Sequence, residues 1–228
     1  MKKTLWVSGS VLVCALVGVS VFCYFLLQRM DRMVVATKAI QASSEEMALQ
    51  VEITNSLMSS DTVRLRVIEY LKHHSTKLSP AQCVATGSAI MEGASAYHIP
   101  ASLTLAIIEK ESTFDPNAIS PQGALGLMQI LPATALPYLR EISPRSVGVA
   151  EALHCPETNV RVGLAYLNDL HLSLMDGSTF TYSLVAYNSG ELSARALRNH
   201  TSVPPISLAY ASSILHLQQQ IRPRGELP

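Results

Sequence analysis

The sequence predicts a mainly helical protein in which a membrane-spanning helix and a helical linker precede one globular domain. Apolar residues recur at helical spacing along most of the 228 residues, and nothing alternates with period two over a useful length outside a short Gly-rich segment. The apolar fraction of 48% is high enough to indicate a membrane segment. The segment itself is marked by an N-terminal run without charged residues.

Residues 1–29 are predicted to be an uncleaved transmembrane signal anchor. Thr4 to Leu27 contain no charged residue, and roughly 20 apolar residues are enough to cross a hydrocarbon core of about 30 Å. A cleaved signal peptide is the alternative, but its apolar core is only about 7–15 residues long and ends at a small-x-small site. Here the apolar run continues through Phe25, well past the candidate site near Gly18 and Ser20.

Residues 30–78 are predicted to be a helical juxtamembrane linker. Met33, Ile40 and Met47 follow one another at a seven-residue step, as in a coiled coil, but the positions between them hold small or polar residues. Two interpretations stay open: a spacer between membrane and domain, which the composition favours, and an oligomerising stalk. A second amphipathic stretch, Asp61 to His74, carries one apolar face made of Val63, Val67, Tyr70 and Leu71.

The globular domain is predicted to extend over residues 79–220, with a tail at residues 221–228. Its start has a physical signal, because Ser79 fits an N-cap, Pro80 fits the first helical position, and Gln82 completes a capping box. The boundary therefore falls where a new helix begins.

Several helices follow inside the domain. Ala101 to about Ser112 is almost wholly apolar, so we expect this helix to be the buried centre. Further helices are expected over Asn159 to about Leu174, Thr181 to Asn188 and Ser207 to Gln220. The stretch from Arg140 to Cys155 contains proline and glycine and is expected to be irregular.

Composition argues against several kinds of partner and cofactor. Lys+Arg and Asp+Glu number 17 each, so the chain lacks the excess of positive charge with which proteins bind nucleic acid. No metal or other cofactor is expected, because the acidic residues do not gather at calcium-loop spacing and the histidines are scattered. Cys83 and Cys155 lie outside the predicted anchor, and a disulfide and two free thiols are both open.

Glu111 is the candidate catalytic residue. It follows Ile107 by four positions and Leu103 by eight, so helical spacing places its carboxyl on the buried apolar stripe, while Glu109 points to the opposite side. Desolvation penalises the charged form of a carboxyl and raises its pKa. A general acid needs this in order to hold a proton near neutral pH. The alternative is a helix-terminal glutamate paired with a nearby cation.

The segment after Glu111 has the composition of a backbone-lined groove. Ser120 to Gly123 fits a β-turn with proline second and glycine last. Gly123 and Gly126 permit unusual backbone angles and the close approach of a ligand. Apolar contact and one amide are expected from Leu127, Met128 and Gln129.

The whole stretch from Glu111 to Ala135 fills every fixed position of ESxFxPxAxSxxGAxGLMQIxPxTA. It thereby resembles the signature of the soluble-lytic-transglycosylase family, which shares a goose-type lysozyme-like fold. Pro156 to Leu167 resembles the family's P-x-x-N-x-x-x-G-x-x-Y-L stretch, and Ala186 to Gly190 its A-Y-N-x-G. The resemblance covers about Pro80 to Leu217, so the anchor and linker lie outside it.

The resemblance implies cleavage of the β-1,4 bond between N-acetylmuramic acid and N-acetylglucosamine in peptidoglycan, without water, to give 1,6-anhydro ends. Glu111 would act first as acid and then as base, with Tyr187 beside it. The glycan would be held by Ser120, Gly126, Leu127, Met128, Gln129 and Asn188. Ordinary glycosidases use a second carboxylate at roughly 5–9.5 Å. The nearest candidate here, Asp115, falls on a position that the motif leaves open.

One stretch departs from the family pattern. Ile206 to Ala209 stands where the family usually has a polar run before its tyrosine, here Tyr210. Because peptidoglycan lies outside the bacterial inner membrane, the resemblance implies the orientation of the predicted anchor: a single-pass inner-membrane protein with its domain in the periplasm. Two other functions stay open: a tethered glycan-binding or assembly factor of an envelope-spanning machine, and a lysozyme-type hydrolase on the same fold.

Overall fold

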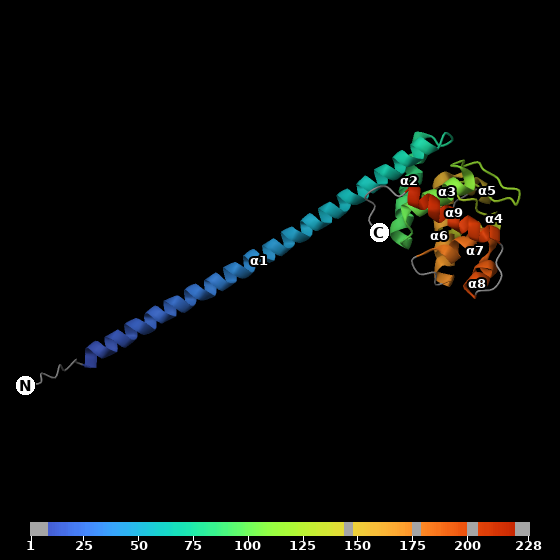
Figure 1. The fold of residues 1–228 in the computed structure, drawn as a ribbon. Coiled ribbons are helices and arrows are strands. Elements are labelled where there is room, and N and C mark those ends of the chain that lie inside the picture. The colour runs from blue at the N-terminus through green and yellow to red at the C-terminus, as the bar shows by residue number, and fades with distance from the viewer. Residues whose placement is uncertain (1–8, 144–147, 175–178, 200–204, 222–228) are drawn as a thin grey trace, which may run out of the picture. The chain divides into compact units, whose positions relative to one another are not determined.

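The computed structural model describes residues 9–143, 148–174, 179–199 and 205–221 (Figure 1), and of residues 9–16 and 53–59 it describes the backbone alone. The regular secondary structure of these residues is helical, and β-type pairing among them is confined to two isolated bridges, Ile119 with Leu125 and Leu125 with Ile130. The predicted mainly helical fold is therefore confirmed. The chain divides into two compact units, residues 1–59 and 60–228.

The first unit is made by the N-terminal part of helix α1 (Gly9–His74), which continues into the second unit without a break. The two helical stretches expected between Met30 and His74 are thus one helix. Its side chains are exposed over residues 17–52. Within the residues described, none of the helices is both long and apolar enough for a membrane crossing. The predicted span begins at Thr4, which lies outside the described residues.

The second unit begins with the last turns of α1, where Val67 and Leu71 are buried in the core. The compact unit therefore includes turns that the sequence assigns to the linker. Helix α2 (Pro80–Tyr97) starts as predicted. The Ser79 N–H donates to the Gln82 side chain at 2.9 Å, and the Gln82 N–H donates to the Ser79 hydroxyl at 3.3 Å.

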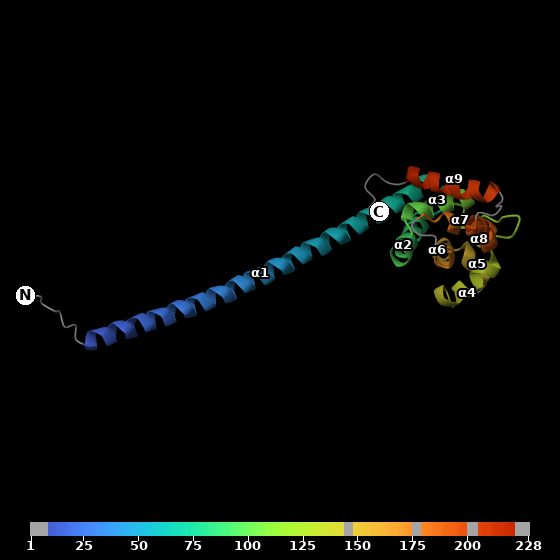
Figure 2. The ribbon, with the colours of Figure 1, turned by 60° about the horizontal axis from the view of Figure 1, so that its bottom comes forward.

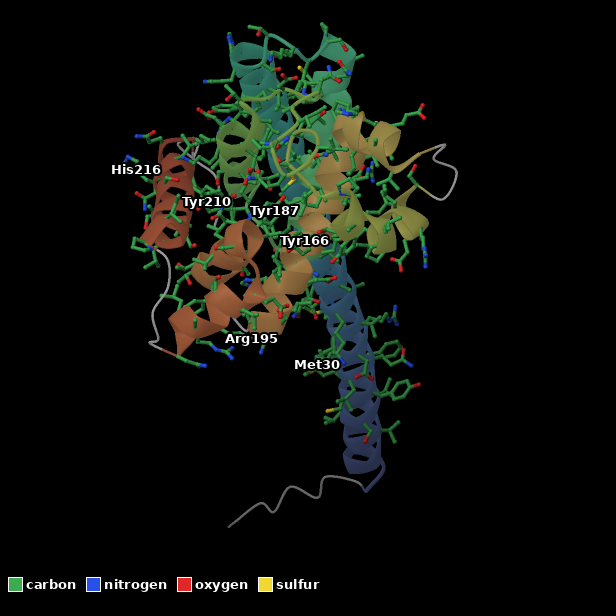
Figure 3. The ribbon with its side chains drawn as sticks, turned by 90° about the vertical axis from the view of Figure 1, so that its right-hand side faces the viewer. Met30, Tyr166, Tyr187, Arg195, Tyr210 and His216 are labelled. Atoms are coloured by element: carbon green, nitrogen blue, oxygen red, sulfur yellow. The ribbon has the colours of Figure 1, made fainter. Side chains whose placement is uncertain are left out.

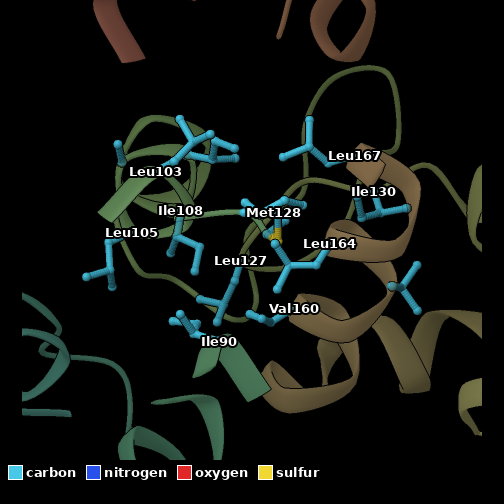
Figure 4. Packing of buried hydrophobic residues seen from close by; sticks show 14 of the residues in the cluster. Ile90, Leu103, Leu105, Ile108, Leu127, Met128, Ile130, Val160, Leu164 and Leu167 are labelled. Carbon is cyan, nitrogen blue, oxygen red and sulfur yellow. The ribbon is translucent and has the colours of Figure 1, made fainter. Parts of the chain in front are cut away.

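Helix α3 (Ala101–Ser112) is the centre of this unit, and its residues 101–108 are all buried, as predicted. Helix α9 (Pro205–Ile221) lies along it (Figure 2). Helix α6 (Pro156–Leu174) packs against α2 and against α7 (Thr181–Ser189). Helix α7 in turn packs against α8 (Glu191–Arg198). Figure 4 shows side chains of α2, α3 and α6 meeting around the loop that carries Leu127 and Met128.

Two short helices differ from the sequence-based expectation. Helix α4 (Pro132–Ile142) begins at a proline that suits a first turn. However, α5 (Val149–His154) lies in the stretch expected to be irregular, and α8 was not predicted. Both have eight residues or fewer, which is about two turns. That length is too short for an apolar repeat to stand out from its surroundings.

Candidate active site

Glu111 lies in the last turn of α3, immediately before a sharp reversal of the chain. Thr113 and Phe114 have φ values of 50° and 59°, in the left-handed region that residues other than glycine rarely adopt. Phe114 is 1% exposed, so its packing holds the reversal in place. The Ser112 hydroxyl contacts the carbonyl of Leu127 at 2.8 Å and thereby ties the end of α3 to the following loop.

The environment of Glu111 is that of a protonatable carboxyl. Burial raises its pKa, and this effect outweighs the hydrogen bond from Tyr210 and the charge of Lys110, which both lower it. Within the described part of the chain, none of the ion pairs includes Glu111. The helix-terminal ion-pair alternative is therefore not supported.

Glu109 lies on another side of the same helix, as predicted. Its Oε2 accepts a hydrogen bond of 2.9 Å from the Tyr70 hydroxyl of α1. Glu111, in contrast, accepts from α9. The two carboxyls of the α3 terminus consequently have separate surroundings.

Two tyrosines from distant helices approach Glu111. The Tyr210 hydroxyl of α9 donates to Oε1 of Glu111, and the Tyr187 hydroxyl of α7 donates to the carbonyl of Met128 at 2.7 Å. Burial raises the pKa of both phenols well above the usual value, and the negative charge of Glu111 adds to the effect. Both therefore remain neutral hydrogen-bond donors. Figure 3 shows Tyr210, Tyr187 and Tyr166 lying one after another across the domain.

The predicted β-turn is present at Ser120 to Gly123. The Gly123 N–H donates to the Ser120 carbonyl at 2.9 Å, and Gly123 has a φ of +81°. The Ser120 hydroxyl accepts from the Ala124 N–H at 3.0 Å. This side chain therefore closes the turn, and a role toward a glycan stays a prediction.

Gly126 is required by the protein itself. Its φ is +77°, and a Cβ atom at this position would lie 2.3 Å from both the Leu153 carbonyl oxygen and Nδ2 of Asn159. The sequence predicts that a ligand approaches Gly126 closely. In the structure two protein groups, the Leu153 carbonyl and the Asn159 amide, occupy this space. A contact of Gly126 with a glycan stays a prediction.

The fully buried Asn159 holds the glycine loop from behind. Its Oδ1 accepts from the Met128 N–H at 2.8 Å, and its Nδ2 donates to the carbonyls of Leu125 at 2.9 Å and Leu153 at 2.8 Å. One amide therefore satisfies three buried backbone groups. This explains why a polar residue stands on the inner face of α6.

The side chains of Leu127 and Met128 are 0% exposed. That of Met128 packs onto α6, where a Cβ at Gly163 would lie 2.4 Å from its sulfur (Figure 4). The expectation that these side chains offer apolar contact to a ligand is therefore wrong, because they fill the core instead. Their backbone atoms are buried with them.

Gln129 contributes mainly to the shape of the loop. It adopts a φ of 49°, and its Nε2 donates to the carbonyls of Ala118 at 3.1 Å and Gly126 at 2.9 Å. The amide oxygen is the polar atom that remains for a ligand. Asn188, the residue after Tyr187, is exposed.

Asp115, the nearest candidate for a second carboxylate, is engaged elsewhere. It forms an ion pair with Lys77 and accepts a 2.9 Å hydrogen bond from the Asn117 N–H. The hydrogen bond with Lys77 holds the pKa of this carboxyl below its usual range. Asp115 is therefore a structural anion of the turn.

Sequence reasoning missed three contributions to the site: the contact of Tyr210 with Glu111, the bond from Ser112 to the loop, and the support by Asn159. Ser112 and Asn159 do occupy fixed positions of the recognised motifs, which was the available signal. Cys83 and Cys155 are free thiols, the first buried and the second exposed.

Comparison with known proteins identifies the family to which this domain is similar. The family model described as "Transglycosylase SLT domain" matches residues 88–210. The chain is 34% identical over 116 residues to the soluble lytic murein transglycosylase of Escherichia coli K12, covering 51% of this chain and 18% of that protein. It is 31% identical over 146 residues to membrane-bound lytic murein transglycosylase C of Haemophilus influenzae PittGG, covering 60% and 41%.

A solved structure gives the same result for the fold. The crystal structure of the 70 kDa soluble lytic transglycosylase of Escherichia coli aligns with a TM-score of 0.51 and 27% sequence identity, covering 59% of this chain and 24% of that one. The chain thus spans less than half of the length of each of these proteins. The residues that the family model matches, 88–210, include Glu111.

Proposed function

Because the chain belongs to the Transglycosylase SLT domain family, we propose that it is a peptidoglycan lytic transglycosylase. It cleaves the β-1,4 bond between N-acetylmuramic acid and N-acetylglucosamine and leaves a 1,6-anhydromuramoyl end. The observation that carries this proposal is the environment of Glu111. Its carboxyl is partly buried, its pKa is raised, and it accepts a hydrogen bond from the Tyr210 hydroxyl. Nearby Asp115 is held in an ion pair with Lys77, so Glu111 is the single carboxyl that takes part in the proposed reaction.

In the first step Glu111 acts as the general acid. Its raised pKa keeps a proton on the carboxyl at a higher pH than an exposed glutamate would. The proton passes to the glycosidic oxygen as the bond from that oxygen to the anomeric carbon breaks. The hydrogen bond from Tyr210 to Oε1 steadies the carboxylate that remains.

In the second step the same carboxylate acts as the base. It takes the proton of the muramoyl 6-hydroxyl while that oxygen bonds to the anomeric carbon. Water takes no part, so the products together contain the same atoms as the substrate. One carboxyl can serve both steps, because the proton that it gives up in the first step is replaced by the one that it takes in the second.

The neighbouring groups position the glycan. Tyr187 fixes the loop through the Met128 carbonyl and presents its ring beside Glu111. Exposed Asn188, the Ser120 hydroxyl and the amide oxygen of Gln129 can bond acetamido groups. Gly126, Leu127 and Met128 are buried and shape the loop that carries these groups.

We place the protein in the bacterial inner membrane with its catalytic domain in the periplasm. The uncharged run from Thr4 to Leu27 supports an anchor, and relatives described as membrane-bound lytic murein transglycosylase C support an envelope location. An anchored enzyme of this size also suits local opening of the wall for an envelope-spanning machine.

Digestion of purified peptidoglycan by the full chain in detergent micelles tests the proposal. Mass spectrometry should find 1,6-anhydro ends, and none with Glu111→Gln. Reducing ends would instead identify a lysozyme-type hydrolase on the same fold. Intact glycan that nevertheless binds the protein would favour the glycan-binding or assembly factor.

A further inference from the structure

Helix α9 is joined to two other helices by side-chain hydrogen bonds that lie about one turn apart. One runs from the Tyr210 hydroxyl to Glu111 of α3. The other joins the hydroxyls of Ser207 in α9 and Ser189 at the end of α7, whose oxygens are 2.7 Å apart. Ser207 precedes Tyr210 by three positions, so the two side chains are neighbours on one face of α9. We call Ser189 and Ser207 the serine pair.

The serine pair connects the inside of the domain with its surface. Ser207 is 0% exposed, whereas Ser189 is exposed. Water does not reach the Ser207 hydroxyl, so the bond to Ser189 satisfies a group that would be costly to bury alone. The Ser189 hydroxyl also contacts the carbonyl of Val185, one turn earlier in α7, at 3.0 Å. The first turn of α9 is thereby bonded to the last turn of α7.

The apolar contacts of α9 do not fix its position as sharply as this bond does. The apolar side chains that α9 buries in the core include Ala211, Ile214 and Ile221. Hydrophobic burial is not directional, so it tolerates small sliding and rotation of a helix. A hydrogen bond weakens steeply once the two atoms lie beyond about 3.2 Å or lose their alignment. The serine pair therefore fixes the start of α9 along α7, and with it the place of the Tyr210 hydroxyl.

The position of the Tyr210 hydroxyl matters because of the other groups that face Glu111. Tyr187 of α7 and Lys110 of α3 are both close enough to interact with its charge. Burial raises the pKa of Glu111, and the hydrogen bond from Tyr210 lowers it more than the charge of Lys110 does. A shift of α9 would therefore act on the strongest of the described contacts that favour the ionised carboxyl.

We propose that Ser189 and Ser207 are positioning residues, which hold α9 so that the Tyr210 hydroxyl stays bonded to Oε1 of Glu111. The serine pair touches no reacting atom and acts through Tyr210. This inference rests on the proposed function and adds to it a device that sets the proton affinity of the acid. The A-Y-N-x-G motif leaves position 189 open, and Ser207 lies in the stretch that departs from the family pattern. The pair is thus a feature of this chain and not of the recognised motifs.

Titration of the Glu111 carboxyl by ¹³C NMR tests the inference without requiring cleavage. The full chain in detergent micelles is labelled at its glutamate carboxyls, and the spectrum of Glu111→Gln identifies the signal. Ser207→Ala and Ser189→Ala should each raise the pKa of Glu111, in the same direction as Tyr210→Phe. Ser189→Thr keeps the hydroxyl and should restore the wild-type curve. The matched control Ser212→Ala, at an exposed site on α9, should leave the curve unchanged.

A double-mutant cycle shows whether the serine pair acts through Tyr210. Adding Ser207→Ala to Tyr210→Phe should cause no further rise in the pKa of Glu111, because the hydroxyl that the pair positions is already absent. In cleavage assays each serine variant should lower kcat roughly two- to tenfold, the range that corresponds to one neutral hydrogen bond. Each should also shift the alkaline limb of kcat/KM upward, which a loss of packing alone would not do.

Wild-type titration of Glu111 in Ser207→Ala and Ser189→Ala would overturn the inference, as would a shift that persists in full beside Tyr210→Phe. Because Ser189 is exposed, Ser189→Ala should fold like the wild type and carries the test if Ser207→Ala unfolds. A protein whose Glu111 titration depends on the serine pair but which leaves peptidoglycan intact would refute the proposed enzyme alone.

Discussion

The Tyr210 hydroxyl donates a hydrogen bond to Oε1 of Glu111, although the two residues are 99 positions apart in the chain. The contact joins the last helix, α9, to the central helix, α3. A donor at this oxygen stabilises the ionised carboxyl, so it opposes the increase in pKa that burial causes. The proton affinity of the candidate acid is thus set by residues from both ends of the domain.

Replacing Tyr210 by phenylalanine should change the pH profile of cleavage. Loss of the hydrogen bond removes an effect that lowers the pKa of Glu111, so the carboxyl should stay protonated to a higher pH. The alkaline limb of kcat/KM should shift upward. kcat should fall about tenfold or more, because a hydrogen bond to a charged group is worth roughly 1.5–3 kcal/mol. A uniform loss of rate with an unshifted profile would assign Tyr210 a packing role only.

Glu111→Gln should stabilise the fold at neutral pH. The pKa of Glu111 is raised above its usual value of about 4.5 in the folded state, so the folded protein binds this proton more tightly than the unfolded chain does. Stability is therefore lost as pH rises from about 4.5 through the folded pKa. Thermal unfolding should show a Tm a few degrees above wild type at pH 7 and no difference at pH 3. Exposed Glu151→Gln serves as the control, and equal Tm values at both pH values would contradict the buried-acid account.

Local signals in the sequence were sufficient for some elements. The Ser79 cap, the apolar run from Ala101 to Ser112 and the Ser120 to Gly123 turn each depend on neighbours within a few residues, and each is present. Periodicity likewise separated Glu111 from Glu109 correctly. These features follow from backbone geometry that the chain fixes locally.

Gly126→Ala and Gly123→Ala form a matched pair of substitutions in the loop. Both glycines have positive φ, so alanine costs about 1–2 kcal/mol at either position. A Cβ at Gly123 meets nothing within 4 Å, whereas one at Gly126 lies 2.3 Å from a backbone carbonyl and a buried amide. Denaturant unfolding should therefore show a much larger loss of stability for Gly126→Ala. Similar losses for both variants would refute the close packing of Gly126 on Asn159.

Asn159→Ala should destabilise the domain strongly. Removal of the amide leaves the Met128 N–H and the carbonyls of Leu125 and Leu153 without this partner. An unsatisfied buried group costs about 1–3 kcal/mol, so we expect a loss of at least 3 kcal/mol in the free energy of unfolding. Asn117→Ala, at an exposed position, should change it by less than about 0.5 kcal/mol.

Other features could not be read from the sequence because they depend on contacts between distant segments. No periodic repeat exists in an irregular loop, so the inward orientation of Leu127 and Met128 was not predictable. The partner of Tyr210 depends on how α9 lies along α3. Tyr138, Tyr166 and Tyr187 lie on three helices, and the contacts between their rings depend on how those helices pack.

The central claim is that Glu111 directs intramolecular transfer without water, and digestion of peptidoglycan in water enriched in ¹⁸O tests it most directly. The full chain in detergent micelles should release fragments with anhydromuramoyl ends that carry no ¹⁸O, and Glu111→Gln should release none. Fragments whose new muramoyl ends carry ¹⁸O would show that water attacks the anomeric carbon, and would contradict the account.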